Sequence, residues 1–385
     1  MSHTKRLDAQ QPPVEQLPPS LQAVVLVGGQ GTRLRPLTLT TPKPLVPLAN
    51  RPVIEHIVRW LERYAITEIF LATQYQAAAF DRWLRRWQGT PVHAVAEPAP
   101  RGTAGAVAHL AERLHGTTIV VNGDNLQDLD LAALLAAHRA HAGVATIATD
   151  RVADPTGRGV VVSDHAGHVT EFQEKPAPGT ARANTVNTGV YVLEPAALAM
   201  IPRDTFCNFE QQVFPQLIAA EAGLFAFQSA HTWIDTGTPD GYLRAQAAVL
   251  GSGASQPAGR PVAGRDTGNG LWQADAVNVD SAAQLSGGVA LGFGTMIASH
   301  VRVNASSIGR ECHILPQALV ERSAIWDGCM IEQGAAIYDS IIGFNCYIGA
   351  EARLDGAVVG DGCIIRSGAE VPAGTRLQPR STYPG

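Results

Sequence analysis

Residues 308–324 read IGRECHILPQALVERSA, and the next stretch, residues 325–341, reads IWDGCMIEQGAAIYDSI. In both stretches an apolar residue recurs at intervals of 6, 6 and 5 positions, so the whole pattern has a period of 17. Fifteen positions follow this spacing without exception: Leu291, Ile297, Val303, Ile308, Ile314, Val320, Ile325, Ile331, Ile337, Ile342, Ile348, Leu354, Val359, Ile365 and Val371. Such a period predicts a solenoid, in which each coil buries its apolar side chains only by stacking on its neighbours.

Small residues repeat in step with the apolar ones. A cysteine lies four positions after the first apolar residue of each coil, and an alanine four positions after the second: Cys312, Cys329, Cys346 and Cys363, then Ala318, Ala335, Ala352 and Ala369. One apolar and one small residue per side, with three sides per turn, describes a triangular prism in which every coil adds one strand to each of three parallel sheets. This pattern resembles the hexapeptide-repeat left-handed parallel β-helix, and we expect that fold over residues 271–385.

The cysteine column has a structural explanation. A zinc site needs ligands that converge on one point, whereas these four cysteines form a straight ladder inside the prism. Stacked neighbours lie about 4.8 Å apart, within reach of a disulfide, but a cytoplasmic protein keeps its thiols reduced. We therefore expect buried structural thiols in a cytoplasmic protein.

Enzymes with a β-helix of this kind are often acyltransferases, which carry a catalytic histidine on a loop inserted between coils. Here the repeat from 291 to 371 has no insertion, and His300 and His313 fall within coils at predicted outward positions. An architectural role is therefore favoured over acyl transfer. Because the end coils of such a prism expose apolar rungs, we also expect the domain to help assemble a homo-oligomer.

Amino-acid composition indicates the nature of the remaining segments and the classes of partner that a chain of this charge does not favour. Residues 251–270 contain six Gly, two Pro and two Ser, a composition typical of a linker. Residues 1–20 contain four prolines and lack the apolar core of a signal peptide, so we expect a disordered tail. The net charge is −5, and no apolar run is long enough for a transmembrane helix. Neither nucleic acid nor an anionic membrane is a favoured partner, because both select a basic surface.

Residues 21–250 alternate short apolar runs with amphipathic stretches. Strands are predicted at 23–27, 68–72, 117–121, 144–149 and 159–162, and helices at 52–64, 80–87 and 131–141. This alternation predicts an α/β fold: a Rossmann-like, mostly parallel sheet with helices on both faces. In such sheets ligands bind beyond the carboxyl ends of the strands, and Gly28 and Asp124 lie at such ends.

A glycine-rich loop, GGQGTRLRPLT at residues 28–38, follows the first strand. The loop lacks the Gly-Lys-Ser/Thr of a Walker A motif, and Leu34 stands where a dinucleotide fingerprint needs its third glycine. A glycine-rich turn still lets backbone N–H groups approach phosphate oxygens, and Arg33 and Arg35 add fixed positive charge. The loop therefore predicts a phosphate-binding site.

Together with TPKPLVPL at residues 41–48, this loop resembles the signature of the sugar-1-phosphate nucleotidyltransferases. The similarity covers residues 21–250 through five shorter motifs: PRGTAG at 100–105, NGD at 122–124, EKP at 174–176, NTGVY at 187–191 and WIDTGTP at 233–239. A C-terminal β-helix behind such a domain is similar to the layout of the mannose-1-phosphate guanylyltransferases. The resemblance implies a reaction between a nucleoside triphosphate and a sugar 1-phosphate, which yields a nucleotide sugar and pyrophosphate.

The resemblance also implies a role for each matching residue. Asp124 and Asp235 would hold Mg²⁺, while Arg33 and Lys43 would bind the triphosphate and steady the leaving pyrophosphate. Lys175 would bind the sugar phosphate. The other residues would line the nucleotide side (Gly28, Gly29, Gly31, Thr32, Gln74, Gly102 and Thr103) or the sugar side (Gly159, Glu174 and Asn187). Catalysis would consist of alignment and charge stabilisation, without a covalent intermediate.

Lysine usage singles out two of these positions. Only three of the 29 basic residues are lysines, and two of them, Lys43 and Lys175, lie inside the motifs. A chain that otherwise uses arginine has kept a compact, mobile ammonium group at both places, where a planar guanidinium would not be equivalent.

The substrates are less sharply indicated than the reaction. The motifs at 124–125 and 235–238 are also similar to those of glucose-1-phosphate thymidylyltransferases, whereas 102–105 and 209–215 are more similar to guanylyltransferases. Arg158 stands where family members often carry tyrosine. We expect GTP and mannose 1-phosphate. The alternatives are a glucose-1-phosphate thymidylyl-, uridylyl- or adenylyltransferase, and a non-catalytic regulatory subunit that binds a nucleotide sugar.

Overall fold

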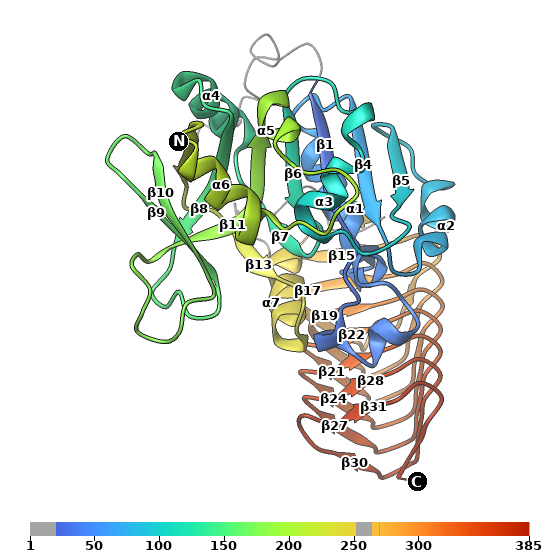
Figure 1. The fold of residues 1–385 in the computed structure, drawn as a ribbon. Helices are drawn as coiled ribbons and strands as arrows, with labels where there is room; N and C mark the ends of the chain where they lie inside the picture. Colours follow the sequence, from blue (N-terminus) through green and yellow to red (C-terminus); the bar gives the residue numbers. More distant parts are fainter. Residues whose placement is uncertain (1–20, 252–263, 269, 385) are drawn as a thin grey trace, which may run out of the picture.

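The computed structural model describes residues 21–251, 264–268 and 270–384. The predicted tail at 1–20 and most of the predicted linker at 251–270 lie outside these ranges. Figure 1 shows an α/β domain, coloured blue to yellow, and below it a stack of coils, coloured orange to red. Within the described residues, no helix is both long and apolar enough to cross a membrane.

The α/β domain is built on a nine-stranded sheet. Its main path is β10-β9-β11-β6-β1-β4-β5, and β8 joins β12 to β11. Seven of these strands point the same way, while β10 and β11 run against them. This confirms the mostly parallel sheet predicted from the sequence. The strands are β1 (Gln22–Leu26), β4 (Glu68–Thr73), β5 (Val92–Ala96), β6 (Thr118–Asn122), β8 (Ala145–Arg151), β9 (Gly159–Ser163), β10 (Val169–Glu174), β11 (Thr185–Leu193) and β12 (Leu224–Gln228).

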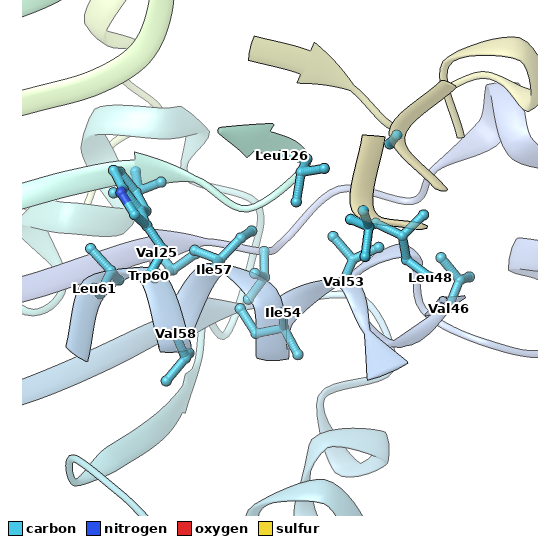
Figure 2. Close-up of a cluster of buried hydrophobic side chains, with 14 of the residues drawn as sticks. Val25, Val46, Leu48, Val53, Ile54, Ile57, Val58, Trp60, Leu61 and Leu126 are labelled. Carbon is cyan, nitrogen blue, oxygen red and sulfur yellow. The ribbon is translucent and has the colours of Figure 1, made fainter. Parts of the chain in front are cut away.

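Helices cover both faces of this sheet, because its central strands are apolar on both sides. On β1, Val25 belongs to one buried cluster and Val24 to the other. Figure 2 shows the first cluster, in which Ile54 and Ile57 gather with Val25. The first layer contains α1 (Val53–Glu62), α2 (Phe80–Leu84), α4 (Leu131–His141) and α7 (Pro239–Leu250); the second contains α3 (Gly102–Ala108), α5 (Pro195–Ala199) and α6 (Phe214–Ala219).

The C-terminal part is a curled parallel sheet whose strands stack coil upon coil, which is the arrangement of a β-helix (Figure 1). Ile314 pairs with Ile331 and Ile331 with Ile348, so neighbouring coils are offset by one period of the sequence repeat. All fifteen apolar positions of the repeat are at most 3% exposed. The strands are β15 (Leu271–Gln273), β16 (Asn278–Val279), β17 (Gln284–Leu291), β18 (Met296–Ile297), β19 (Arg302–Ile308), β20 (His313–Ile314), β21 (Leu319–Glu321), β22 (Ala324–Ile325), β23 (Met330–Ile331), β24 (Ala336–Tyr338), β25 (Ile341–Ile342), β26 (Tyr347–Ile348), β27 (Arg353–Asp355), β28 (Val358–Val359), β29 (Ile364–Ile365), β30 (Glu370–Val371), β31 (Arg376–Leu377) and β32 (Thr382–Tyr383).

The register departs from this period at both ends of the stack. Asn278 pairs with Met296, and Ile364 with Thr382, so each of these offsets is one position longer than the period. A further short strand, β14 (Arg265–Asp266), lies inside the predicted linker and pairs antiparallel with β15. The first coil is therefore bordered by residues that the glycine-rich composition alone assigns to a linker.

The four cysteines of the repeat form the predicted interior ladder. All of them are free and buried. Each thiol donates a hydrogen bond to a backbone carbonyl of the following coil, at Sγ–O distances of 3.0–3.2 Å: Cys312 to Trp326, Cys329 to Gly343, Cys346 to Gly360 and Cys363 to Gln378. The repeated thiol thus fills a small slot and satisfies one carbonyl per coil, which explains its period.

Helix α7 joins the two parts through a continuous buried core. The hydroxyl of Tyr242 donates to the carbonyl of Pro47 and accepts a hydrogen bond from Nε1 of Trp326, which lies 3.2 Å away. One helical turn later, the Gln246 side chain bonds the carbonyl of Ser323 at 2.9 Å and the hydroxyl of Ser307 at 2.6 Å. These polar groups are buried and satisfied, so the junction is a specific interface.

The β-helix also reaches the glycine-rich loop directly. Nη1 of Arg376 donates to the carbonyl oxygens of Arg33 and Arg35, at 2.8 and 2.7 Å. Nearby, the hydroxyl of Thr40 donates to Oδ2 of Asp361 at 2.7 Å. The loop that carries the predicted phosphate-binding residues is therefore held from outside by two coils of the β-helix.

Candidate active site

A cavity of about 480 Å³ opens at the carboxyl ends of the parallel strands. Its walls are the segments that directly follow β1, β4, β5 and β6, as expected for a sheet of this type. Ten of the residues singled out in the sequence line it: Gly28, Gly29, Gly31, Thr32, Arg33, Lys43, Gln74, Gly102, Thr103 and Asp124. The glycine-rich loop and three distant motifs therefore share one pocket.

Glycine is required in this loop at Gly31. Its φ of +61° lies in the left-handed region, where a side chain is strained. A Cβ atom there would also lie 2.9 Å from Cβ of Lys43 and 3.0 Å from Cγ2 of Thr38. At Gly29, in contrast, a Cβ would meet nothing within 4 Å. The loop is thus tightly packed on its Lys43 side and open next to Gly29.

Two basic side chains meet Asp124 and Asp235 in the site. Nζ of Lys43 lies 2.9 Å from Oδ2 of Asp124 and 3.6 Å from Oδ1 of Asp235. Nη2 of Arg33 lies 3.1 Å from Oδ2 of Asp235. The Lys43 side chain is only 7% exposed, whereas those of Asp124 and Asp235 are 44% and 36% exposed. The two carboxylates therefore remain accessible to solvent on either side of a buried ammonium group.

A small two-stranded sheet brings these carboxylates together. Strand β13 (Trp233–Asp235) pairs with β7 (Asn125–Gln127), and Asp235 lies opposite Asn125. The backbone N–H and hydroxyl of Thr236 both donate to the carbonyl of Asp124, at 3.0 and 2.8 Å. Burial acts to raise the pKa of Asp235, but the Lys43 ammonium, the Gly237 N–H and Arg33 outweigh it, so its pKa is below the ordinary value.

The two carboxylates fit a divalent cation. Both already converge on one positive centre, the Nζ atom of Lys43, which marks the place where a cation is stabilised. Among the described residues, no group of three or more His, Cys, Asp or Glu side chains could hold a metal ion. A hard cation bound here would therefore take its other ligands from water and substrate phosphates, as Mg²⁺ commonly does.

Gly102 and Thr103, at the start of α3, also line the cavity. Gly102 has a φ of +74°, and a Cβ there would lie 2.5 Å from Oδ1 of Asn208. That same oxygen accepts a hydrogen bond from the Thr103 N–H at 3.0 Å. The Thr103 hydroxyl donates to Oε2 of Glu210 at 3.0 Å and accepts from the Phe209 N–H at 2.9 Å. The segment around Asn208 thus fixes this part of the lining.

The predicted sugar-side residues lie outside the lining of this cavity. Gly159 pairs with Glu174 across the β9–β10 hairpin, and Nζ of Lys175 lies 3.2 Å from Oε1 of Glu174. Asn187, on β11, donates to the Tyr191 hydroxyl at 2.8 Å. Asp235 is also outside the lining, although it contacts two lining residues, Arg33 and Lys43. Arg158, the departure from the family pattern, lies over the Trp233 ring at 4.7 Å.

A hydrogen-bonded chain connects the two groups of predicted residues. The Tyr191 hydroxyl that accepts from Asn187 donates to Oε1 of Glu210 at 3.3 Å, and Oε2 of Glu210 accepts from Thr103. Glu210 lies in the π-helical turn Phe209–Val213. Asn187 on the predicted sugar side is thus linked through two buried or half-buried groups to Thr103 on the nucleotide side.

Among the residues that line the cavity, Glu97 and Phe206 were not recognised from the sequence as site residues. Glu97 directly follows β5, so its position at a strand end is the signal that could have found it. That strand was not predicted, because its residues, VHAVA, are only partly buried and weakly apolar. Burial raises the pKa of Glu97 above its ordinary value, although the N–H and the charge of Arg101 oppose the shift. Phe206 is 63% exposed.

Exchange of the buried lysine for arginine should be damaging despite the conserved charge. We expect Lys43→Arg to lower kcat by roughly 10²–10³-fold, because a larger planar head cannot occupy the position between Asp124 and Asp235. Lys175→Arg, at the other retained lysine, should also lower activity. Steady-state pyrophosphate release measures both, with the exposed Arg244→Lys as control. Wild-type rates in both lysine variants would contradict the prediction.

Comparison with known proteins agrees with this geometry. The family model described as nucleotidyl transferase matches residues 22–252, and the model of the EIF2B subunit epsilon LbH domain matches residues 268–376. A mannose-1-phosphate guanylyltransferase of Mycobacterium tuberculosis is 35% identical over 307 residues, which cover 78% of this chain and 83% of that protein. A probable mannose-1-phosphate guanylyltransferase 3 of Oryza sativa subsp. japonica is 33% identical over 79% of this chain and 86% of that protein.

Solved structures are similar to part of the chain. The crystal structure of HddC from Yersinia pseudotuberculosis has 28% sequence identity and a TM-score of 0.52, and the match covers 58% of this chain and 97% of that chain. The same protein complexed with GMP-PN gives 27% identity and a TM-score of 0.50. The loop at 28–38, the converging Asp124 and Asp235 and the family match over more than half of the sequence lead to one conclusion: this chain is an enzyme that belongs to the nucleotidyl transferase family.

Proposed function

We propose that this enzyme transfers GMP from GTP to mannose 1-phosphate and releases GDP-mannose and pyrophosphate, with Mg²⁺ as its metal. The observation that carries the proposal is the pair of accessible carboxylates, Asp124 and Asp235, on either side of the buried Lys43 at the main cavity. The guanylyltransferase relatives, which align over about four fifths of the chain, support the choice of substrates.

The reaction brings two polyanions together, so charge has to be neutralised. An oxygen of the sugar phosphate attacks the α-phosphorus of the triphosphate, and the bond to the β-phosphate oxygen breaks as pyrophosphate leaves. Lys43 and Arg33 offset the charge of the triphosphate and of the departing pyrophosphate. Asp124 and Asp235 would hold a divalent cation, which would supply the remaining charge neutralisation. Glycine-rich backbone at Gly28 and Gly29 leaves room for close approach of the phosphates.

The sugar phosphate is assigned to the β9–β11 region. Lys175, whose side chain is 69% exposed, is free to turn from Glu174 toward a phosphate group. Glu174 and Asn187 are suited to sugar hydroxyls, because they offer carboxylate and amide groups, and Gly159 leaves space beside Glu174.

The carboxylate of Glu97 favours guanine over the other bases. Guanine presents two adjacent donors, N1–H and the N2 amino group, which match the two acceptor oxygens of a carboxylate. Adenine has an acceptor at N1, and thymine or uracil has one N–H between two carbonyls, so none of them offers this pair. Oε2 of Glu97 already accepts a hydrogen bond from the Arg101 N–H at 3.1 Å. The carboxylate is still partly desolvated, so further donors stabilise it, which favours the base that donates twice.

Replacement of this carboxylate should relax base selection. We expect Glu97→Gln to lower kcat/KM for GTP by about 10²-fold or more while ATP and UTP lose little, because an amide offers only one acceptor oxygen. The measurement is kcat/KM for four nucleoside triphosphates with mannose 1-phosphate. Glu112→Gln is the control, since Glu112 is exposed and contacts Arg203. An unchanged ratio of GTP to ATP use would remove Glu97 from base recognition.

The function itself is tested by a substrate panel. Four nucleoside triphosphates are combined with mannose 1-phosphate and glucose 1-phosphate, and pyrophosphate release is followed with Mg²⁺ present. GTP with mannose 1-phosphate should give the highest kcat/KM. A preference for dTTP, UTP or ATP with glucose 1-phosphate would select the corresponding alternative enzyme. Binding of GDP-mannose without turnover of any pair would identify a regulatory subunit.

We also propose the domain limits, the handedness of the β-helix, the cellular compartment and the oligomeric state. The domain limits are 21–250 for the catalytic part, 251–270 for the linker and 271–385 for the β-helix, which is left-handed as in hexapeptide-repeat proteins. The match of residues 268–376 to an LbH domain supports this handedness. The enzyme acts in the cytoplasm as a homo-oligomer, and four free buried thiols in one column suit a reducing compartment.

A further inference from the structure

The three faces of the β-helix differ in their outward-pointing residues. The face made by β22, β25 and β28 packs on the α/β domain, and its outward residues Ala324, Ile341 and Val358 are at most 4% exposed. The face made by β21, β24, β27 and β30 is rich in charge: Glu321, Arg353, Asp355 and Glu370 point outward, and Arg353 covers the Tyr338 ring at 4.5 Å. One face is therefore apolar and covered, and another is charged and open.

The third face is apolar and open. It is the seven-stranded sheet β16-β18-β20-β23-β26-β29-β32. Strand pairing aligns its outward residues in one column: Met296, His313, Met330, Tyr347, Ile364 and Thr382. Met296 is 47% exposed, Tyr347 39% and Ile364 47%. They are half of the six large apolar side chains that the described residues expose. A column of this kind on a regular sheet is typical of a surface that another protein covers.

Charge along the edge of this face indicates what covers it. Each inward isoleucine of this face is followed by a residue at the edge of the face. In three successive coils these residues are Glu332, Gly349 and Arg366. Among the described residues, no carboxylate forms an ion pair with Arg366, and the Glu332 carboxylate accepts a hydrogen bond only from the Tyr347 hydroxyl, at 3.2 Å. The two opposite charges are two coils apart, roughly 10 Å at one strand spacing per coil, so they do not meet within one chain.

A second copy of the chain satisfies both charges at once. Consider a two-fold axis that lies between the two copies, parallel to the strands, at the level of the coil that contains Tyr347. This axis would place the preceding coil of one copy against the following coil of the other. Glu332 would then face Arg366 of the second copy, and Arg366 would face Glu332. The same operation places Met330 against Ile364 and Tyr347 against its own equivalent. Such a surface is self-complementary, which is the requirement for an isologous dimer contact.

We propose that the seven-stranded face of the β-helix is the contact between two copies of this chain, which pack with their β-helix axes antiparallel. The surface differs from the end coils, where sequence analysis placed the association. No residue of the predicted active site lies on this face. The inference does not depend on the nucleotide or sugar that the enzyme uses.

A charge exchange tests this proposal in the full-length protein. Sedimentation equilibrium of the wild type should give twice the 40.7 kDa of one chain, or an even multiple of it. Arg366→Glu places like charges opposite each other and should weaken association at least tenfold. The double variant Glu332→Arg with Arg366→Glu restores opposite pairs, so it should recover the wild-type mass. Ile364→Arg should dissociate the protein.

The matched control is Arg353→Glu on the charged face, which should leave the mass unchanged. Melting temperatures near the wild-type value would show that each variant is folded, because all these side chains are at least partly exposed. A monomeric wild type would overturn the proposal. Wild-type mass for both Arg366→Glu and Ile364→Arg would do the same. Failure of the double variant to recover the mass would refute the two-fold arrangement.

Discussion

Asp124→Asn and Asp235→Asn should each reduce turnover by at least about 10²–10³-fold while the protein keeps its fold. Each substitution removes one of two negative charges that converge on Lys43, and an amide is a poorer ligand than a carboxylate for a hard divalent cation. Both side chains are more than one third exposed, so the change buries no new polar group. Single-turnover pyrophosphate release is the direct measurement.

The control and a second readout separate metal binding from general damage. Asp240→Asn, in the first turn of α7, should be fully active because its carboxylate is exposed and pairs with Arg244. If Asp124 and Asp235 hold the metal, the remaining activity of each variant should need more Mg²⁺ for half-saturation. A variant with a near wild-type rate at low Mg²⁺ would remove that residue from the metal site.

Ile331→Asp should melt or precipitate the β-helix. Ile331 is fully buried and pairs with Ile314 and Ile348 in the neighbouring coils. A carboxylate there would be surrounded by apolar side chains without a partner, which costs several kcal/mol or forces its protonation. Thermal unfolding and the soluble fraction measure the effect. Gln333→Asp, at an exposed corner just after the strand, should behave as the wild type. A soluble Ile331→Asp protein with an unchanged melting temperature would contradict the register of the repeat.

The β-helix was predictable because each coil repeats one environment. Ile314, Ile331 and Ile348 occupy the same inward position in successive coils, so the sequence contains the same local pattern several times. The repeat is uniform only in the middle, however. The longer offsets at Asn278 and Thr382 follow from local departures at the ends, and the period alone does not indicate them.

In the α/β domain, the predictable elements were those whose signals lie in adjacent residues of the sequence. Helix α4 occupies the predicted residues 131–141, because Asp130 accepts hydrogen bonds from Ala132 and Ala133 at its start. Helix α2 ends at Leu84, before the aromatic pattern does. The antiparallel strands β10 and β11 were not predicted. Strand β11 pairs with β6, β8 and β9, which are distant in the sequence, whereas β10 forms a local hairpin with β9 that the sequence pattern did not reveal.

Some features of the candidate site also follow from local sequence, whereas others depend on pairing between distant segments. The glycine-rich loop is a local feature, and its place after β1 follows from strand order. The approach of Asp235 to Asp124 depends on β13 pairing with β7, so residue types alone do not reveal it, and only the family resemblance indicated it. Glu97 was missed because β5 is half-exposed and lacks a clear apolar run.

The hydrogen bonds from Arg376 to the glycine-rich loop have a consequence for synthesis of the protein. Arg376 is 343 residues beyond Arg33 in the chain. At translation rates of about 5–20 residues per second, it is added roughly 17–70 s after the loop that it holds. A nascent or prematurely ended chain can thus contain all the predicted site residues from Gly28 to Asp235 without these two hydrogen bonds. Support for the loop arrives only with the final coils, which couples completion of the active site to completion of the polypeptide.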